Sequence, residues 1–238
     1  MKISSPLKNF VPKNIEKFVV AARISPFGFF ILKLVCYVPL FALLEGEGVD
    51  GRYAYSILLV PVLVVLFYFR RDYIELKFPS ALSPSAWIRS LFIGLLVFLI
   101  WILPYPEWMK IGTAGAGFSP LSADGNIDLP LLAIRFSGLC LVVPLMEELF
   151  WRSFLLRWLD QAQFLQMDPV HISNRAFIIV ATLFALEHNL ILAGFVAGVG
   201  YNWLYRLERN LWAPLVAHML TNTMLGIWIL YHHAWQYW

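Results

Sequence analysis

The sequence predicts an all-α fold, a polytopic transmembrane helical bundle of seven or eight helices. Hydrophobic residues make up 60% of the 238 residues and charged residues only 14%, and the mean hydropathy is +0.70. A helix needs about 20 apolar residues to cross a hydrocarbon layer about 30 Å thick, and several stretches of this chain reach that length. These runs of Leu, Val, Ile and Phe lack the alternation of a transmembrane barrel, so we expect helices.

The first half of the chain is expected to contain a basic lead-in, residues 1–24, and three membrane-spanning helices. We expect these spans at about residues 26–44, 54–69 and 87–105. Charged or proline-containing segments end them, because such residues do not continue an apolar helix; these segments are 45–48, 70–72 and 104–106. Residues 106–129 are rich in Gly, Ser and Pro and are expected to form an exposed loop.

The second half is expected to open with one long helix over residues 130–159. Pro144 lacks a backbone N–H, so we expect the helix to bend there and to leave carbonyl groups free. Two shorter helices are expected at about 175–188 and 190–205, and a last span at about 211–231. Basic residues at the N-terminus, at 70–77 and at 206–209 predict that all three segments face the cytoplasm, which seven spans would allow.

The segment after Pro144 places three ionisable residues, Glu147, Glu148 and Arg152, in an apolar helix. A charge near the bilayer centre costs at least about 2.5 kcal/mol, so such groups pair internally and indicate a functional site. Glu148 and Arg152 are four residues apart and share a helix face, whereas Glu147 points elsewhere. Glu147 is therefore a candidate general base. A purely structural role, with Glu148 and Arg152 locking the helix, is the alternative.

Two further helices carry costly polar residues. Phe184 and His188 lie one turn apart at the end of one expected helix, and His218 and Asn222 lie one turn apart on the last span. A single histidine on an apolar helix is more often a core residue. Polar groups on three separate membrane helices, however, avoid the free-energy cost of contact with lipid only by converging on one another or on a hydrated cavity.

With these residues the chain resembles the CPBP family of intramembrane glutamate proteases, which includes CAAX proteases and bacteriocin-processing (ABI) proteins. The resemblance covers about residues 130–230. It rests on three motifs in the family's order, each of them weak alone: EExxxR at Glu147, Glu148 and Arg152, FxxxH at Phe184 and His188, and HxxxN at His218 and Asn222.

The resemblance implies a catalytic role for four of these residues. Glu147 and His188 would activate a water molecule that attacks a peptide carbonyl, and His218 with Asn222 would hold the resulting oxyanion. Glu148, Arg152 and Phe184 would support them. Peptide hydrolysis needs a base, a proton carrier and oxyanion donors, which these residues can supply. We expect one integrated membrane domain, in which residues 1–129 hold the basic segment and three helices and residues 130–238 the catalytic helical core.

Other mechanisms fit the sequence less well. Glu147, His188 and His218 could serve as zinc ligands, but the chain lacks an HExxH helix, and the resemblance implies neither metal nor cofactor. No GxSxG motif is present, and Cys36 and Cys140 lie outside the polar cluster. A non-enzymatic immunity or peptide-binding protein, or a proton-coupled carrier, could use the same polar core.

The expected partners are a peptide or protein substrate, which could be lipidated or exported, and the lipid bilayer; no nucleic acid is expected. Short loops and the lack of eukaryotic targeting features favour a prokaryotic plasma membrane with a cytoplasmic N-terminus. The spacing of Gly194, Gly198 and Gly200 predicts close helix packing.

Overall fold

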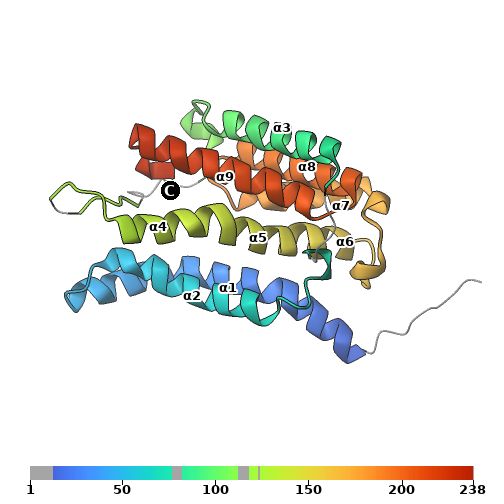
Figure 1. Cartoon of the computed structure of the whole chain (residues 1–238), viewed down its shortest axis with the longest axis horizontal. Coiled ribbons are helices and arrows are strands. Elements are labelled where there is room, and N and C mark those ends of the chain that lie inside the picture. Colours follow the sequence, from blue (N-terminus) through green and yellow to red (C-terminus); the bar gives the residue numbers. More distant parts are fainter. Residues whose placement is uncertain (1–12, 77–81, 112–117, 123, 238) are drawn as a thin grey trace, which may run out of the picture.

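The computed structural model describes residues 13–76, 82–111, 118–122 and 124–237, and these residues form helices and turns without a named strand (Figure 1). The predicted all-helical class is confirmed. The start of the basic lead-in, residues 1–12, and part of the 106–129 loop lie outside the described residues. Seven main helices occur in the described ranges: α1 (Lys13–Gly46), α2 (Ala54–Tyr68), α3 (Pro84–Trp101), the continuous helix α4–α6 (Leu129–Trp158), α7 (Asn174–Leu186), α8 (Ile191–Glu208) and α9 (Trp212–His232).

Two helices of the first half differ from their predicted bounds. Helix α1 begins at Lys13, so the second half of the basic lead-in is helical, and its arms Lys17–Leu32 and Cys36–Gly46 meet at a bend of 50°. Helix α3 ends at Trp101, ahead of Pro104, because residues preceding a proline disfavour the α conformation. Ser83 caps its start by accepting a hydrogen bond from the backbone N–H of Ala86.

The described helices include fewer candidates for membrane spans than the seven spans that we predicted from the sequence. Four described helices are long and apolar enough, namely Gly51–Tyr68, Pro84–Trp101, Leu129–Trp158 and Trp212–His232, and the bent α1 would make a fifth. Helix α7 has 13 residues, which at 1.5 Å per residue gives only about 20 Å. The polar turn Glu187–His188–Asn189 follows its end, and Glu187 and His188 of this turn belong to the candidate site.

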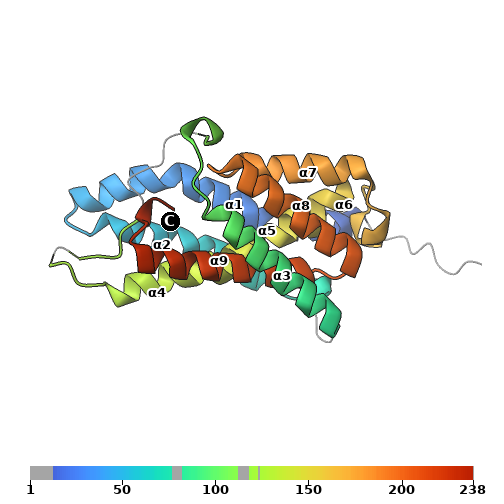
Figure 2. The ribbon, with the colours of Figure 1, turned by 90° about the horizontal axis from the view of Figure 1, so that it is seen from above.

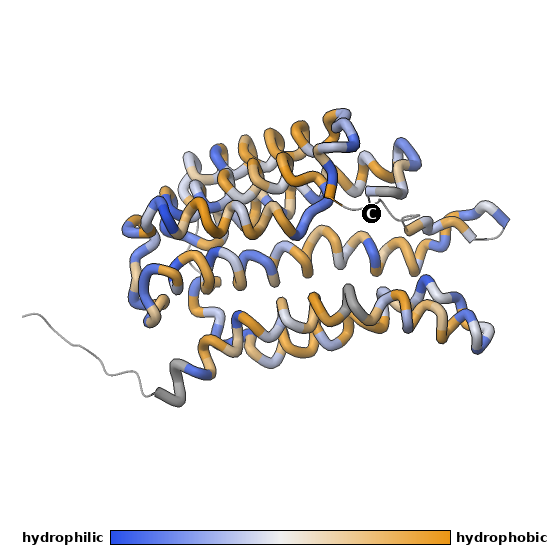
Figure 3. Tube along the Cα trace, turned by 180° about the vertical axis from the view of Figure 1, so that it is seen from behind, coloured by the Kyte–Doolittle hydropathy of each residue, from blue (hydrophilic) through white to orange (hydrophobic). Residues whose placement is uncertain are grey.

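The long helix α4–α6 lies between two groups of helices (Figures 1 and 2). Helices α1 and α2 pack together on one side of it, and α3, α7, α8 and α9 pack together on the other. Hydrophobic residues follow the helices and hydrophilic residues gather at the turns (Figure 3). Large apolar side chains on the outer faces are exposed, including Leu43, Phe67, Ile88 and Phe92, as expected of lipid-facing surfaces.

Two π-helical segments interrupt the long helix, Gly138–Val142 and Leu149–Leu155. In the first, the N–H of Val143 donates to the carbonyl of Gly138, five residues earlier. The next donor in that pattern would be Pro144, which has no N–H, so the carbonyl of Leu139 is released. The Asn222 side chain donates to this carbonyl at 2.9 Å. The π turn thus accommodates Pro144 within one 30-residue helix, and the expected free carbonyl is used by a site residue.

The predicted close packing occurs between α7 and α8. A Cβ added at Gly198 would lie 2.9 Å from the Cα of Ala181, and one at Gly194 would lie 3.0 Å from the Cα of Ala185. Gly200 faces α3 instead, where its nearest neighbour is the side chain of Ile93. Glycine at 194 and 198 therefore lets the two helix backbones approach closely.

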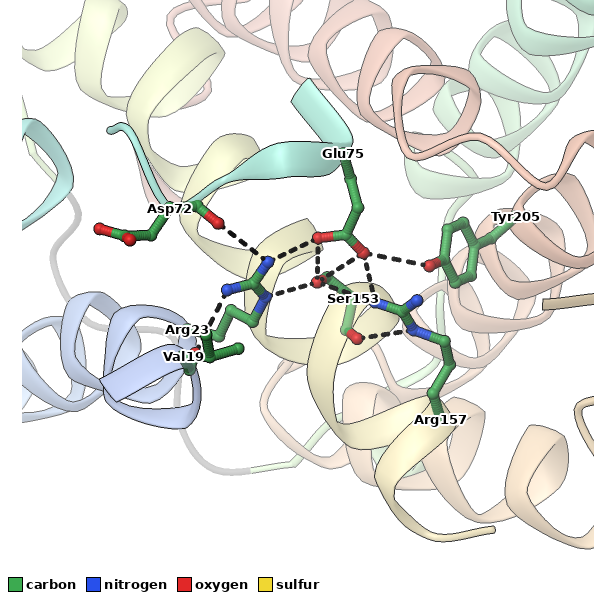
Figure 4. Close-up of polar contacts among 7 residues, drawn as sticks. All are labelled: Val19, Arg23, Asp72, Glu75, Ser153, Arg157 and Tyr205. Atoms are coloured by element: carbon green, nitrogen blue, oxygen red, sulfur yellow. Dashed lines mark hydrogen bonds and ion pairs between the residues drawn. The ribbon is translucent and has the colours of Figure 1, made fainter. Parts of the chain in front are cut away.

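A buried ionic cluster joins α1 and the α2–α3 connection to the second π segment (Figure 4). Glu75 accepts hydrogen bonds from Arg23 at 2.8 Å and from Ser153 at 2.8 Å, and it forms an ion pair with Arg157. Arg23 is fully buried and also donates to Ser153. Burial alone would raise the pKa of Glu75, but Arg157 and Arg23 outweigh it and hold the pKa below its usual range. Nothing in the local sequence singled out this cluster, because its members come from three distant segments.

Candidate active site

A cavity of about 760 Å³ lies between α1, the long helix, α7, α8 and α9. Glu147, His188, His218 and Asn222 all line it, so the structure places these four candidate residues around one cavity. Most of the remaining wall is apolar and aromatic, including Phe30, Val38, Phe41, Trp101, Val143 and Leu225. A pocket of this size with a few convergent polar groups has the general form of a ligand-binding site.

Glu148 does not line the cavity, and one of its carboxylate oxygens accepts hydrogen bonds from both Arg152 and His218. Its Oε1 accepts from Arg152 Nη1 at 2.9 Å, as the four-residue spacing predicted, and from His218 Nδ1 at 2.8 Å. Glu148 and Arg152 are both fully buried. Arg152 Nε also donates to Asn202 Oδ1 at 3.2 Å. Glu148 therefore links α9 to the long helix through His218. Glu148 and Arg152 neutralise each other's charge inside the bundle.

Phe184 contributes to the site in two ways. Its ring lies under the guanidinium of Arg152, with 4.4 Å between Cζ and the ring centroid, a geometry that favours a desolvated cation. Its backbone carbonyl lies 2.7 Å from His188 Nδ1. A carbonyl only accepts, so Nδ1 carries the hydrogen and Nε2 of a neutral His188 is left with a lone pair. The FxxxH spacing thus orients a potential proton acceptor.

His218 has the same arrangement, with Nδ1 fixed and Nε2 available. Its Nδ1 faces the carboxylate of Glu148, and its Nε2 lies 3.8 Å from Glu147 Oε2. The ring stacks on Tyr201 at 4.9 Å between centroids. Nε2 can donate a hydrogen bond only when the ring is an imidazolium. Glu147 is buried and lies within reach to stabilise that charge.

Asn222 keeps part of its amide free for the cavity. One side-chain N–H is directed to the released carbonyl of Leu139, which fixes the plane of the amide. An asparagine amide has a second N–H, and the residue lines the cavity. The π turn before Pro144 and the HxxxN motif are therefore coupled through one hydrogen bond.

Glu187 also lines the cavity, although sequence reasoning gave it no role. Its Oε1 accepts a hydrogen bond from Trp151 Nε1 at 3.1 Å. Its position next to His188 in an otherwise apolar helix end was the signal that could have identified it. Neither Cys36 nor Cys140 is among the residues that line the cavity.

In the part of the chain that the structure describes, no group of three His, Cys, Asp or Glu side chains could hold a metal ion. The Nε2 atoms of His188 and His218 and the carboxylate of Glu147 are thus arranged around a cavity rather than around one coordination point. What the arrangement can do is accept a proton, return it and donate hydrogen bonds to a developing negative charge.

Comparison with known proteins was made on three levels. Residues 129–224 match a family model described as type II CAAX prenyl endopeptidase Rce1-like. A search of curated proteins found no match, and a search of solved structures found none. The matched region begins with the long helix and includes the EExxxR, FxxxH and HxxxN residues, from Glu147 to Asn222. Over residues 129–224 the chain is therefore similar to the CPBP/CAAX protease family.

Proposed function

We propose that this protein is an intramembrane endopeptidase that hydrolyses a peptide bond with water activated by Glu147 and His188. The observation that carries the proposal is the position of Glu147, His188, His218 and Asn222 on the wall of one cavity. The match of residues 129–224 to a CAAX endopeptidase family model supports a membrane-bound peptide hydrolase in general. The roles of the individual residues are our proposal.

In this mechanism a water molecule lies between Glu147 and His188. Glu147 removes a proton from the water while the oxygen attacks the carbonyl carbon of the peptide, and a tetrahedral oxyanion forms. Asn222 donates to the oxyanion through its second amide hydrogen, and protonated His218 donates through Nε2. The C–N bond then breaks, and the proton held by Glu147 or His188 passes to the leaving amine. Acid–base catalysis of this kind contributes about 10²–10⁴-fold to a rate.

The supporting residues make this geometry possible. Glu148 stabilises the imidazolium form of His218 by accepting from Nδ1, while Arg152 keeps Glu148 ionised through the buried pair. The carbonyl of Phe184 directs the lone pair of His188 Nε2 away from α7. These contacts leave the reactive atoms of both histidines free for water and substrate.

The protein is an integral membrane protein, and we propose a prokaryotic plasma membrane with the N-terminus in the cytoplasm. The ends of the helices that carry Arg70, Arg157 and Arg209 lie at one end of the bundle (Figure 1), and the positive-inside rule favours the cytoplasm for that end. The substrate would be a membrane-associated peptide or protein, either lipidated or exported.

A comparison of membrane proteomes tests the proposal. Cells with the wild-type protein should contain new peptide ends that vanish in Glu147→Gln, which keeps the side-chain shape but removes the base. Glu47→Gln, at an exposed position between α1 and α2, is the matched control and should keep those ends. Identical ends in wild type and Glu147→Gln would overturn the mechanism. A biological effect that persists in Glu147→Gln would favour a non-enzymatic binding or immunity protein.

Chelation tests the zinc alternative. Cleavage that depends on Glu147 should persist in 1,10-phenanthroline, because the proposed steps use only protein groups and water. Loss of cleavage that added zinc restores would show that the same residues act through a metal.

A further inference from the structure

Glu187 places a carboxylate in the wall of the cavity, directly beside His188 in the chain. The side chain is exposed, and its Oε1 is held by the indole N–H of Trp151 at 3.1 Å. Trp151 follows Glu147 by four residues along the long helix. The residue that holds Glu187 thus lies about one helical turn from the proposed base along the long helix.

The charge of Glu187 is poorly balanced by the protein. Within the described ranges, no Lys or Arg side chain forms an ion pair with it, and its hydrogen-bond partner Trp151 is a neutral donor. Arg152 is the cation on the neighbouring turn, but its charge is paired with Glu148. A carboxylate in apolar surroundings is costly unless a cation or several donors approach it.

The positive charge on the cavity wall lies at the other end of the long helix. Arg135 lines the cavity 12 residues before Glu147, about 18 Å away along the helix axis. Its guanidinium lies over the rings of Tyr55 at 3.9 Å and Phe118 at 5.0 Å. The end of the cavity around Glu147 and Glu187 thus carries the acidic groups, and the end around Arg135 carries the basic one.

We propose that Glu187 selects peptides with a lysine or arginine side chain close to the bond that is cleaved. The inference rests on the proposed function. An extended peptide advances about 3.3–3.6 Å per residue, so a cation opposite Glu187 would lie within about two residues of the scissile bond. Its ammonium or guanidinium group would complete the ion pair that the protein leaves open, beside a cavity wall that is largely apolar and aromatic.

The test uses the full-length protein in phosphatidylcholine vesicles and a synthetic mixture of apolar peptides of random sequence. Each peptide is present in three versions, with lysine, norleucine or glutamate at one position, and mass spectrometry records the new ends. The proteins compared are the wild type, Glu187→Gln, Glu187→Lys, the inactive Glu147→Gln and the control Glu47→Gln. Norleucine keeps the length of lysine without its charge, so the ratio of the two cleavage rates isolates the effect of charge.

Wild type and Glu47→Gln should cleave the lysine version about ten times faster than the norleucine version when the variable position lies near the bond. A charge-assisted hydrogen bond is consistent with a factor of this size. Glu187→Gln should lower this ratio to about one, and Glu187→Lys should favour the glutamate version. If Glu187→Lys does not fold, the ratio in Glu187→Gln decides.

Two results would overturn the inference while leaving the proposed function intact. One is cleavage that depends on Glu147 but has the same lysine-to-norleucine ratio in wild type and Glu187→Gln. The other is an equal fall in the rates of all three versions in Glu187→Gln, which would assign the carboxylate to proton transfer instead of selection. Absence of any cleavage that depends on Glu147 would overturn the proposed function and the inference together.

Discussion

His218 and Glu148 come from α9 and the long helix, and their side chains meet in a hydrogen bond of 2.8 Å between Nδ1 and Oε1. The same oxygen accepts from Arg152 at 2.9 Å. One carboxylate oxygen therefore fixes the tautomer and orientation of a histidine and also balances a buried arginine. This contact is the direct link between the EExxxR and HxxxN motifs.

Glu148→Gln should lower kcat by about 10–100-fold, a typical effect of removing a group that orients a reacting residue. The neutral amide no longer stabilises the imidazolium form of His218, so oxyanion donation weakens while the cavity wall stays in place. KM should therefore change little. Glu147→Gln should lower kcat further, by about 10²–10⁴-fold, because the base itself is lost.

Initial rates over a range of substrate concentrations check that kcat falls more in Glu147→Gln than in Glu148→Gln. An unchanged kcat in Glu148→Gln would show that the contact with His218 has no part in the reaction. A change confined to KM would assign Glu148 to substrate binding.

Much of the candidate site followed from the sequence, because its signals are local. The pairing of Glu148 with Arg152 is a property of helix geometry, since residues four apart share a face. The position of Glu147, His188 and His218 around one cavity followed from the cost of placing polar groups in apolar helices. The released carbonyl before Pro144 followed from the missing N–H of proline, although the sequence did not predict that Asn222 would bind it.

The remaining features depend on tertiary contacts. Arg23, Glu75 and Arg157 are far apart in the chain, and each alone resembles a solvated or interfacial charge. Helix α7 was long enough on hydropathy to be counted as a span, but its end is set by the polar turn at Glu187. The role of Glu187 became visible only with the position of Trp151, which lies 36 residues earlier.

Arg152→Lys should destabilise the protein even though it keeps the charge. Lysine lacks the planar group that stacks on Phe184 and the Nε donor that bonds Asn202. The loss should be about 2 kcal/mol, or a fall in Tm of about 5 °C for a chain of this size.

Thermal unfolding in detergent, followed by tryptophan fluorescence, measures this change. Arg206→Lys is the matched control, because Arg206 makes an exposed contact with Asn174 and its replacement should stay within about 0.5 kcal/mol of wild type. Equal Tm values for both variants would show that the planar geometry of Arg152 is unimportant.

The ionic cluster at Glu75 should stabilise the protein in a pH-dependent way. The pKa of Glu75 is held low in the folded protein, below the value of about 4.3 for an unfolded glutamate. The stabilisation is therefore fully present at pH 7 and is lost as the pH falls through the folded pKa. Glu75→Gln leaves Arg23 and Arg157 without their carboxylate and should cost about 3 kcal/mol at pH 7.

Unfolding of wild type and Glu75→Gln at a series of pH values from 7 to 3 checks that the stabilisation by Glu75 decreases as the pH falls. The difference in stability between the two proteins should shrink below about pH 4, where the carboxylate becomes protonated first in the unfolded chain and then, at lower pH, in the folded protein. A difference that is constant over this range would mean that the charge of Glu75 does not contribute.

The close approach of α7 and α8 should make Gly198 intolerant of a side chain. In Gly198→Ala the new Cβ would lie 2.9 Å from the Cα of Ala181, and a backbone atom cannot move aside without shifting the helix. Overpacking of this kind costs about 1–3 kcal/mol, more than the gain of up to about 1 kcal/mol in helix propensity. Because His188 lies two residues beyond the end of α7 at Leu186, the shift should also lower the cleavage rate.

Gly200→Ala is the matched control, because it adds the same methyl group to the same helix, and its nearest neighbour is a side-chain methyl group, Cγ2 of Ile93, at 3.0 Å. A rotamer change can accommodate that contact, so the stability of Gly200→Ala should stay within about 1 kcal/mol of wild type. Tm and cleavage rate are measured for both variants. Only Gly198→Ala places its new Cβ against the backbone of α7. Equal Tm values and equal cleavage rates in the two variants would therefore show that backbone contact between α7 and α8 does not set the position of His188.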